Sequence, residues 1–130
     1  MKKTIPGVVL GLVTWIVVAS IGNRLLRAGL AGYADVEKAM TFTQPMLLAR
    51  LVLGAVSSLC AGYVAVWTAR SASNAANALA ALLLVVFIPM HYALWAKFPA
   101  WYHVVFLASL VLLVLLGGRI RLLQARRSGP

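Results

Sequence analysis

Acidic residues are almost missing from this sequence. Only two of its 130 residues are acidic, against twelve Lys and Arg, and only 11% of the chain is charged. A soluble domain usually has about a quarter of its residues charged. With 63% hydrophobic residues and a mean hydropathy of +0.95, a water-soluble fold would expose large apolar patches. The composition therefore excludes an ordinary soluble domain and predicts an integral membrane protein.

Catalytic and redox motifs are also missing. The chain has one cysteine, Cys60, which cannot form a disulfide within the chain and which we interpret as a small buried hydrophobic residue. It contains no Ser-His-Asp set, no Cys-His pair and no phosphate-binding glycine loop. No Asp or Glu falls within a predicted span, although proton-coupled carriers usually keep such a carboxylate. We therefore expect neither an enzyme nor a bound cofactor.

The apolar runs predict an all-α protein, a bundle of four transmembrane helices with short loops forming a single domain. Since a span needs roughly 20 apolar residues, we place the spans at about 5–30, 45–68, 75–96 and 99–118, followed by a basic tail at 119–130. Pro89 is expected to kink the third span or end it early. Gly117 and Gly118 can end the fourth, and the basic tail is expected to form a helical extension along the headgroups.

The first span has features of a secretory signal peptide, with a basic start and small residues near Ala19. Arg24 and Arg27 follow the possible cleavage site, where positive charge hinders export, so we expect an uncleaved first span.

Lys and Arg residues indicate how the chain is oriented. With four spans, both termini share a side that carries seven bases and no acid: Lys2, Lys3, Arg70, Arg119, Arg121, Arg126 and Arg127. The other side carries five bases and both acids. The positive-inside rule then predicts that both termini are cytoplasmic, in a bacterial inner membrane. Because the bases lie at the ends of apolar runs, where they meet lipid headgroups, we expect no nucleic-acid partner.

Small residues recur at intervals of four in the first two spans, at Gly7 and Gly11 and at Gly54, Ser58 and Gly62. This spacing puts them on one helix face and allows close backbone approach. We expect these faces to pack helices together, either within the chain or between copies, so that a homo-oligomer or a membrane-protein partner is possible.

The hairpin at 89–103 gathers the residues that could carry chemistry. His91 and His103 are each six residues from Lys97, so an antiparallel hairpin would put them at similar depth. Three interpretations remain open. The first is an interfacial aromatic belt of Tyr92, Trp95, Trp101 and Tyr102. The second is a metal or haem site at the two histidines, although two ligands are too few for a closed site. The third is a pocket for a lipid headgroup or small amphiphile.

A second group of candidates consists of arginines near the same outer edge. Arg24, Arg27 and Arg50 could bind an anion with Asn23 and Lys97, because guanidinium matches phosphate in a bidentate manner. Alternatively, the arginines could form ion pairs with Asp35 or Glu37, or reach lipid phosphates.

Three functional hypotheses follow. The sequence favours a non-enzymatic structural or accessory membrane subunit or oligomer. The alternatives are a binder or transporter of an anionic lipid or amphiphile at the outer edge, and a metal or haem protein using the two histidines.

Overall fold

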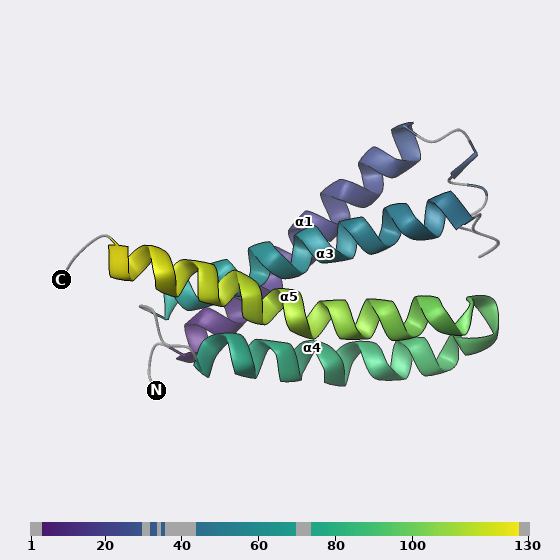
Figure 1. The fold of residues 1–130 in the computed structure, drawn as a ribbon. Coiled ribbons are helices and arrows are strands. Elements are labelled where there is room, and N and C mark those ends of the chain that lie inside the picture. Colours follow the sequence, from purple (N-terminus) through teal and green to yellow (C-terminus); the bar gives the residue numbers. More distant parts are fainter. Residues whose placement is uncertain (1–3, 30–31, 34, 36–43, 70–73, 128–130) are drawn as a thin grey trace.

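The chain folds into a bundle of long helices, as the apolar runs predict (Figure 1). The computed structural model describes residues 4–29, 32–33, 35, 44–69 and 74–127. The elements are α1 (Thr4–Gly29), α3 (Gln44–Thr68), α4 (Asn74–Ala93), the short 3-10 helix η1 (Trp95–Lys97) and α5 (Ala100–Arg127). No strand occurs in these ranges. The predicted all-α class is therefore confirmed.

Four helices of the described chain, α1, α3, α4 and α5, are long and apolar enough to cross a membrane. Side chains such as Val9, Ile16, Val85 and Leu112 are exposed on the outside of the bundle, as expected where lipid rather than water surrounds a helix. Successive helices run in opposite directions, so the start of α1 and the end of α5 lie at one end of the bundle (Figure 1). We call this the basic end, and the end that carries η1 the far end.

Two helix ends differ from the bounds of the predicted spans. Gly117 and Gly118 do not end the last helix, because α5 continues to Arg127. Both glycines are buried where α5 approaches other helices: a Cβ on Gly117 would overlap the carbonyl of Leu59, and one on Gly118 would meet Ala76 and Val66. The absence of a Cβ at these two positions allows the helices to pack closely and does not end the helix. In the third span, Pro89 lies inside α4, and the helix ends at Ala93, before residue 96, which agrees with the alternative of an early end.

The small residues pack helices within the chain. Gly7 and Gly11 let α1 approach Ala61 and Ala65 of α3 and Ala69, the residue that follows it. Gly62 lies against the backbone of Val114 in α5, and Gly54 lies against the ring of Phe106. The four glycines and Ser58 are buried. Of the two packing alternatives, the structure therefore uses these faces inside one chain.

The helices separate toward the far end of the bundle. There, α1 and α3 diverge together from the hairpin of α4 and α5 (Figure 1). The main apolar core lies where the helices are close and includes Leu79, Leu83, Leu110 and Val114. The separation leaves room between the two helix pairs, and the candidate site lies there.

Candidate functional site

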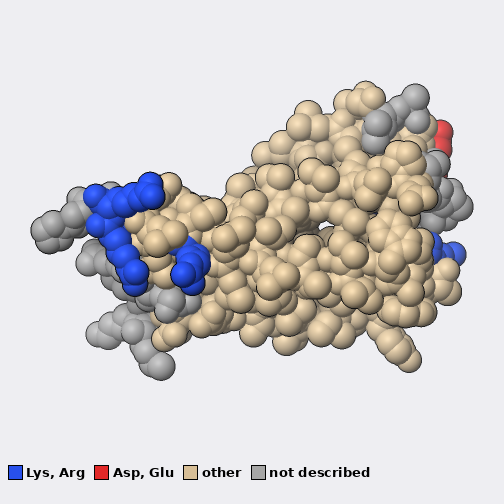
Figure 2. Space-filling view, in the orientation of Figure 1, with Lys and Arg blue, Asp and Glu red and all other residues tan. Residues whose placement is uncertain are grey.

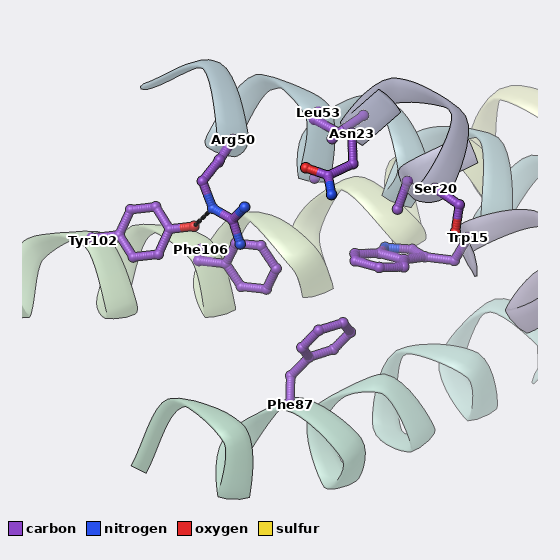
Figure 3. Close-up of a pocket in the computed structure, with 10 residues that line it drawn as sticks. Trp15, Ser20, Asn23, Arg50, Leu53, Phe87, Tyr102 and Phe106 are labelled. Carbon is purple, nitrogen blue, oxygen red and sulfur yellow. Dashed lines mark hydrogen bonds between the residues drawn. The ribbon is translucent and has the colours of Figure 1, made fainter. Parts of the chain in front are cut away.

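A cavity of about 300 Å³ lies between the two diverging helix pairs. Figure 2 shows a hollow between the two halves of the molecule at this end. Residues from all four long helices line the cavity, and most of them are either polar or aromatic (Figure 3), the others being Ala19, Leu53 and Gly54. The polar ones are Ser20, Asn23, Arg50 and Tyr102, and the aromatic ones are Trp15, Phe87 and Phe106. The cavity therefore has a polar wall with one positive charge and an aromatic wall.

Arg50 is the charged residue of this cavity, and two tyrosines hold its guanidinium. Its Nη1 donates a hydrogen bond of 3.0 Å to the hydroxyl of Tyr33, and its Nε donates one of 3.3 Å to the hydroxyl of Tyr102. The Tyr33 hydroxyl donates in turn to Oδ1 of Asn23, at 3.4 Å. Both tyrosines are buried. Hydrogen bonds to two tyrosines, one of them bonded in turn to Asn23, thus fix the direction of the guanidinium.

Tyr102 differs from the interfacial role that the sequence suggested. Its side chain is 3% exposed, and its ring packs between Phe98 at 5.0 Å and Phe106 at 6.1 Å. Of the four aromatic residues expected at the interface, Tyr92, Trp95 and Trp101 are exposed. Tyr102 is instead a buried support for Arg50.

The aromatic wall is built by rings from three helices in mutual contact. Trp15 and Phe87 have centroids 4.8 Å apart, and Phe87 and Phe106 have centroids 5.4 Å apart. The indole Nε1 of Trp15 donates to Oγ of Ser58 at 3.1 Å, and Ser58 donates to the carbonyl of Gly54 at 2.7 Å. The small residue Ser58 therefore has a second role besides packing, which is to orient Trp15.

The two histidines face each other behind this wall. Nδ1 of His91 in α4 lies 2.6 Å from Nδ1 of His103 in α5. His103 is fully buried, and its Nε2 lies 3.3 Å from the carbonyl oxygen of Trp95, whose ring stacks on His103 at 4.8 Å. We call His91 and His103 the histidine pair. The rotation of the two helices, which the sequence left open, brings the imidazoles into contact.

The hydrogen-bond network assigns the tautomers of the histidine pair. A carbonyl oxygen only accepts, so Nε2 of His103 carries a hydrogen and its Nδ1 is an acceptor when the ring is neutral. Nδ1 of His91 must then be the donor. Two nitrogens bound to one zinc ion would lie roughly 3.3 Å apart. The two Nδ1 atoms lie closer, at 2.6 Å, which is the spacing of a hydrogen bond. In the part of the chain that the structure describes, no three His, Cys, Asp or Glu side chains converge.

The other predicted anion ligands lie outside the cavity. Arg24, Arg27 and Lys97 are exposed, as is Asp35. Glu37 lies outside the described residues, so its predicted ion pairs cannot be placed. Only Asn23 and Arg50 of the predicted anion set line the cavity.

Several residues of the site were not singled out from the sequence. They are Trp15, Ser20, Tyr33, Phe87 and Phe106. A signal was present in their spacing: Trp15, Ala19 and Asn23 recur at intervals of four, as do Phe87 and His91, and Tyr102 and Phe106. Residues four apart share a helix face, so extending each candidate by one helical turn would have found most of the cavity.

Fold and site together define a four-helix protein with four candidate membrane spans and an arginine-containing cavity at one end. The chain matches no protein-family model, no curated protein and no solved structure. The function proposed below is therefore inferred from the geometry of the site.

Proposed function

We propose that this protein binds a small anionic amphiphile in the cavity between the two helix pairs. The main observation in support is that one cavity combines the Arg50 guanidinium with an aromatic wall. The anionic head would lie at Arg50 and Asn23, and the apolar body against Trp15, Phe87 and Phe106. This proposal favours the second of the three functional hypotheses.

The chemistry of Arg50 supports an anion as the ligand head. A guanidinium stays charged under all physiological conditions and offers a planar set of N–H donors that suits carboxylate, sulfonate and phosphate groups. Within a low-dielectric bundle, its charge attracts an anion more strongly than it would in water. Tyr33 and Tyr102 hold the guanidinium in one orientation. The side chain of Arg50 therefore loses less conformational entropy when a ligand binds.

The aromatic wall and the size of the cavity support an amphiphile over an inorganic ion. Small-molecule sites are mostly apolar with a few placed polar groups, and this cavity follows that pattern. Its volume of about 300 Å³ is at the lower end of the range for such sites. A ligand with one or two rings or a short chain fits this volume, whereas a whole diacyl lipid could insert only one part of itself.

Calorimetric titration tests this proposal with 2-naphthalenesulfonate as the probe. The protein would be placed in phosphatidylcholine nanodiscs, with empty nanodiscs to subtract partitioning into lipid. We expect saturable binding that Arg50→Gln weakens at least about tenfold, because hydrogen bonds to a charged group contribute about 1.5–3 kcal/mol. Arg50→Lys should fall between the two, because it keeps the charge and loses the planar fork.

A matched control is Arg126→Gln, which removes one arginine at the basic end and should bind as the wild type does. Naphthalene-2-sulfonamide, a neutral analogue of the probe, should bind much more weakly than the sulfonate. The absence of saturable binding to the wild type would overturn the proposal, and so would equal binding by a folded Arg50→Gln variant.

The same proposal includes a location, namely the bacterial inner membrane with both termini in the cytoplasm. By sequence, seven Lys and Arg residues and no acid fall on the side of the basic end, against five and both acids on the opposite side, and Figure 2 shows Lys and Arg gathered at the basic end. This asymmetry follows the positive-inside rule. Helical spans also suit the inner membrane, because bacterial outer-membrane spanning proteins are β-barrels. The cavity would then lie toward the external leaflet.

A further inference from the structure

The histidine pair touches the same aromatic residues that line the cavity. The ring of His91 lies 4.7 Å from Phe106 and 6.2 Å from Tyr102, measured between centroids. Tyr102 also accepts the hydrogen bond from Nε of Arg50. Tyr102 therefore contacts both Arg50 and His91, and the charge of Arg50 acts on His91.

The tautomers leave one basic nitrogen in the histidine pair. Since His91 donates through Nδ1 and His103 donates through Nε2 to Trp95, the nitrogen with an available lone pair is Nε2 of His91. Within the described chain this nitrogen has no hydrogen-bond partner, and the side chain of His91 is partly exposed. His103 by contrast is fully buried, and both of its nitrogens have partners.

We infer that His91 takes up a proton when an anion binds at Arg50, so that the site binds an acidic ligand together with a proton. This inference rests on the proposed function and specifies how the same site is regulated. The chain has no carboxylate in the described spans, and the histidine pair would supply the proton-binding group that such a carboxylate provides elsewhere.

The proton balance of this step is simple. A buffer acid or hydronium ion in the surrounding water gives up a proton and becomes its conjugate base, and the proton adds to the lone pair of Nε2 of His91 to form an imidazolium. The Nδ1–H of His91 stays bonded to Nδ1 of His103, and this hydrogen bond becomes stronger because its donor is charged. His103 keeps its N–H bond to the Trp95 carbonyl. No other bond forms or breaks, so the histidine pair takes one proton without rearrangement.

Electrostatics couple this proton to the anion. His103 and Tyr102 from α5 face His91. Arg50 from α3 is bonded to Tyr102 and acts on His91 through its charge, while Lys97 of η1 is exposed. Without a ligand, the positive charge of Arg50 repels a second positive charge on His91. An anion at Arg50 cancels that repulsion. Linkage then requires that the proton increase the affinity for the anion by the same factor as the anion increases the affinity for the proton.

Calorimetry tests this inference with the same sulfonate probe, which is an anion across the whole pH range of the experiment. Titrations at pH 6.5 in two cationic buffers with different ionisation enthalpies give the number of protons taken up per ligand. For the wild type we expect uptake of up to about one proton, and affinity about tenfold higher at pH 5.5 than at pH 8, within the usual range of coupling between sites.

His91→Asn is the informative variant, because its amide nitrogen can still donate to Nδ1 of His103 but the side chain cannot take up a proton. It should bind the sulfonate without proton uptake and without dependence on pH. The double change His91→Phe with His103→Phe removes both members of the pair together and should give the same result if the single variant does not fold. Tyr92→Phe, at an exposed neighbouring position, should keep the wild-type uptake.

The outcomes separate this inference from the proposed function. Saturable binding by the wild type without proton uptake would overturn the inference and leave the proposed function standing. Uptake that persists in a folded His91→Asn variant would also overturn it. No saturable binding at any pH would overturn the proposed function itself, and the coupling with it.

Discussion

Arg50 and Tyr102 lie 52 positions apart in the sequence and are joined by a hydrogen bond of 3.3 Å from Nε to the phenol oxygen. The bond connects α3 to α5 at the end of the bundle where the helix pairs separate (Figure 3). The Tyr102 ring also contacts the ring of His91, with centroids 6.2 Å apart. One phenol thus positions the cation of the cavity and forms the contact between the cavity and the histidine pair.

Tyr102→Phe removes this hydroxyl and keeps the ring. Because Arg50 loses one of the partners that fix its direction, we expect the affinity for 2-naphthalenesulfonate to fall about threefold to tenfold, in line with about 1 kcal/mol for a typical hydrogen bond. Calorimetry in nanodiscs measures the change. Tyr92→Phe is the matched control, since that side chain is 84% exposed. An unchanged affinity in the Tyr102 variant would mean that Tyr102 does not position Arg50.

Gly62→Ala is expected to destabilise the bundle by about 2 kcal/mol or more. Alanine alone favours a helix by up to about 1 kcal/mol, but the added Cβ would overlap the backbone carbonyl of Val114. A backbone carbonyl in a helix cannot rotate away, so α3 and α5 must separate, which is the usual cost of overpacking. The midpoint of thermal unfolding, followed by circular dichroism in detergent, measures the effect.

The control for this change is Gly29→Ala at the end of α1. Among the described residues, no atom outside the adjoining helix backbone lies within 4 Å of a Cβ at that position, so the variant should be as stable as the wild type or slightly more stable. Equal behaviour of the two variants would show that the close approach at Gly62 does not stabilise the bundle.

Much of the fold could be predicted from composition and hydropathy. A run of apolar residues long enough to span lipid leaves few alternatives to a helix, because backbone groups in lipid must be hydrogen-bonded within the segment. The ends of helices were less predictable. Gly117 and Gly118 carry the signature of a helix stop, yet their lack of a Cβ serves the contact with α3 and α4, and only the tertiary structure separates these two roles.

The candidate site could be predicted only in part, for a geometric reason. Hydropathy gives the depth of a residue in the membrane, so it placed Arg50, His91 and His103 near the same edge. It does not give the rotation of a helix about its axis when nearly every face is apolar. The contact between the imidazoles, the burial of Tyr102 and the aromatic wall all depend on that rotation. Tyr33 lies in the first connection, where no periodic pattern indicates its neighbours.

Ala19→Leu tests the cavity without changing any polar group. Ala19 lines the cavity from α1, and the larger side chain would occupy part of the volume that the proposed ligand needs. We expect the affinity for 2-naphthalenesulfonate to fall at least about tenfold, whereas the thermal midpoint should stay the same or rise, because filling a void adds packing contacts. Val9→Leu, at an exposed position on the same helix, is the control and should leave binding unchanged. Full binding by the Ala19 variant would place the ligand elsewhere.

Single cysteines test the orientation. In a chain whose one cysteine is removed by Cys60→Ala, Lys97→Cys marks the far end and Arg126→Cys marks the basic end; both positions are exposed. We expect a membrane-impermeant maleimide to label Lys97→Cys in intact bacterial cells, and to label Arg126→Cys only after the inner membrane is permeabilised, because clustered arginines are retained in the cytoplasm. Labelling is read as a mass shift on a gel. The reverse pattern would turn the cavity toward the cytoplasm, and labelling of both positions in intact cells would contradict a membrane-spanning arrangement of α5.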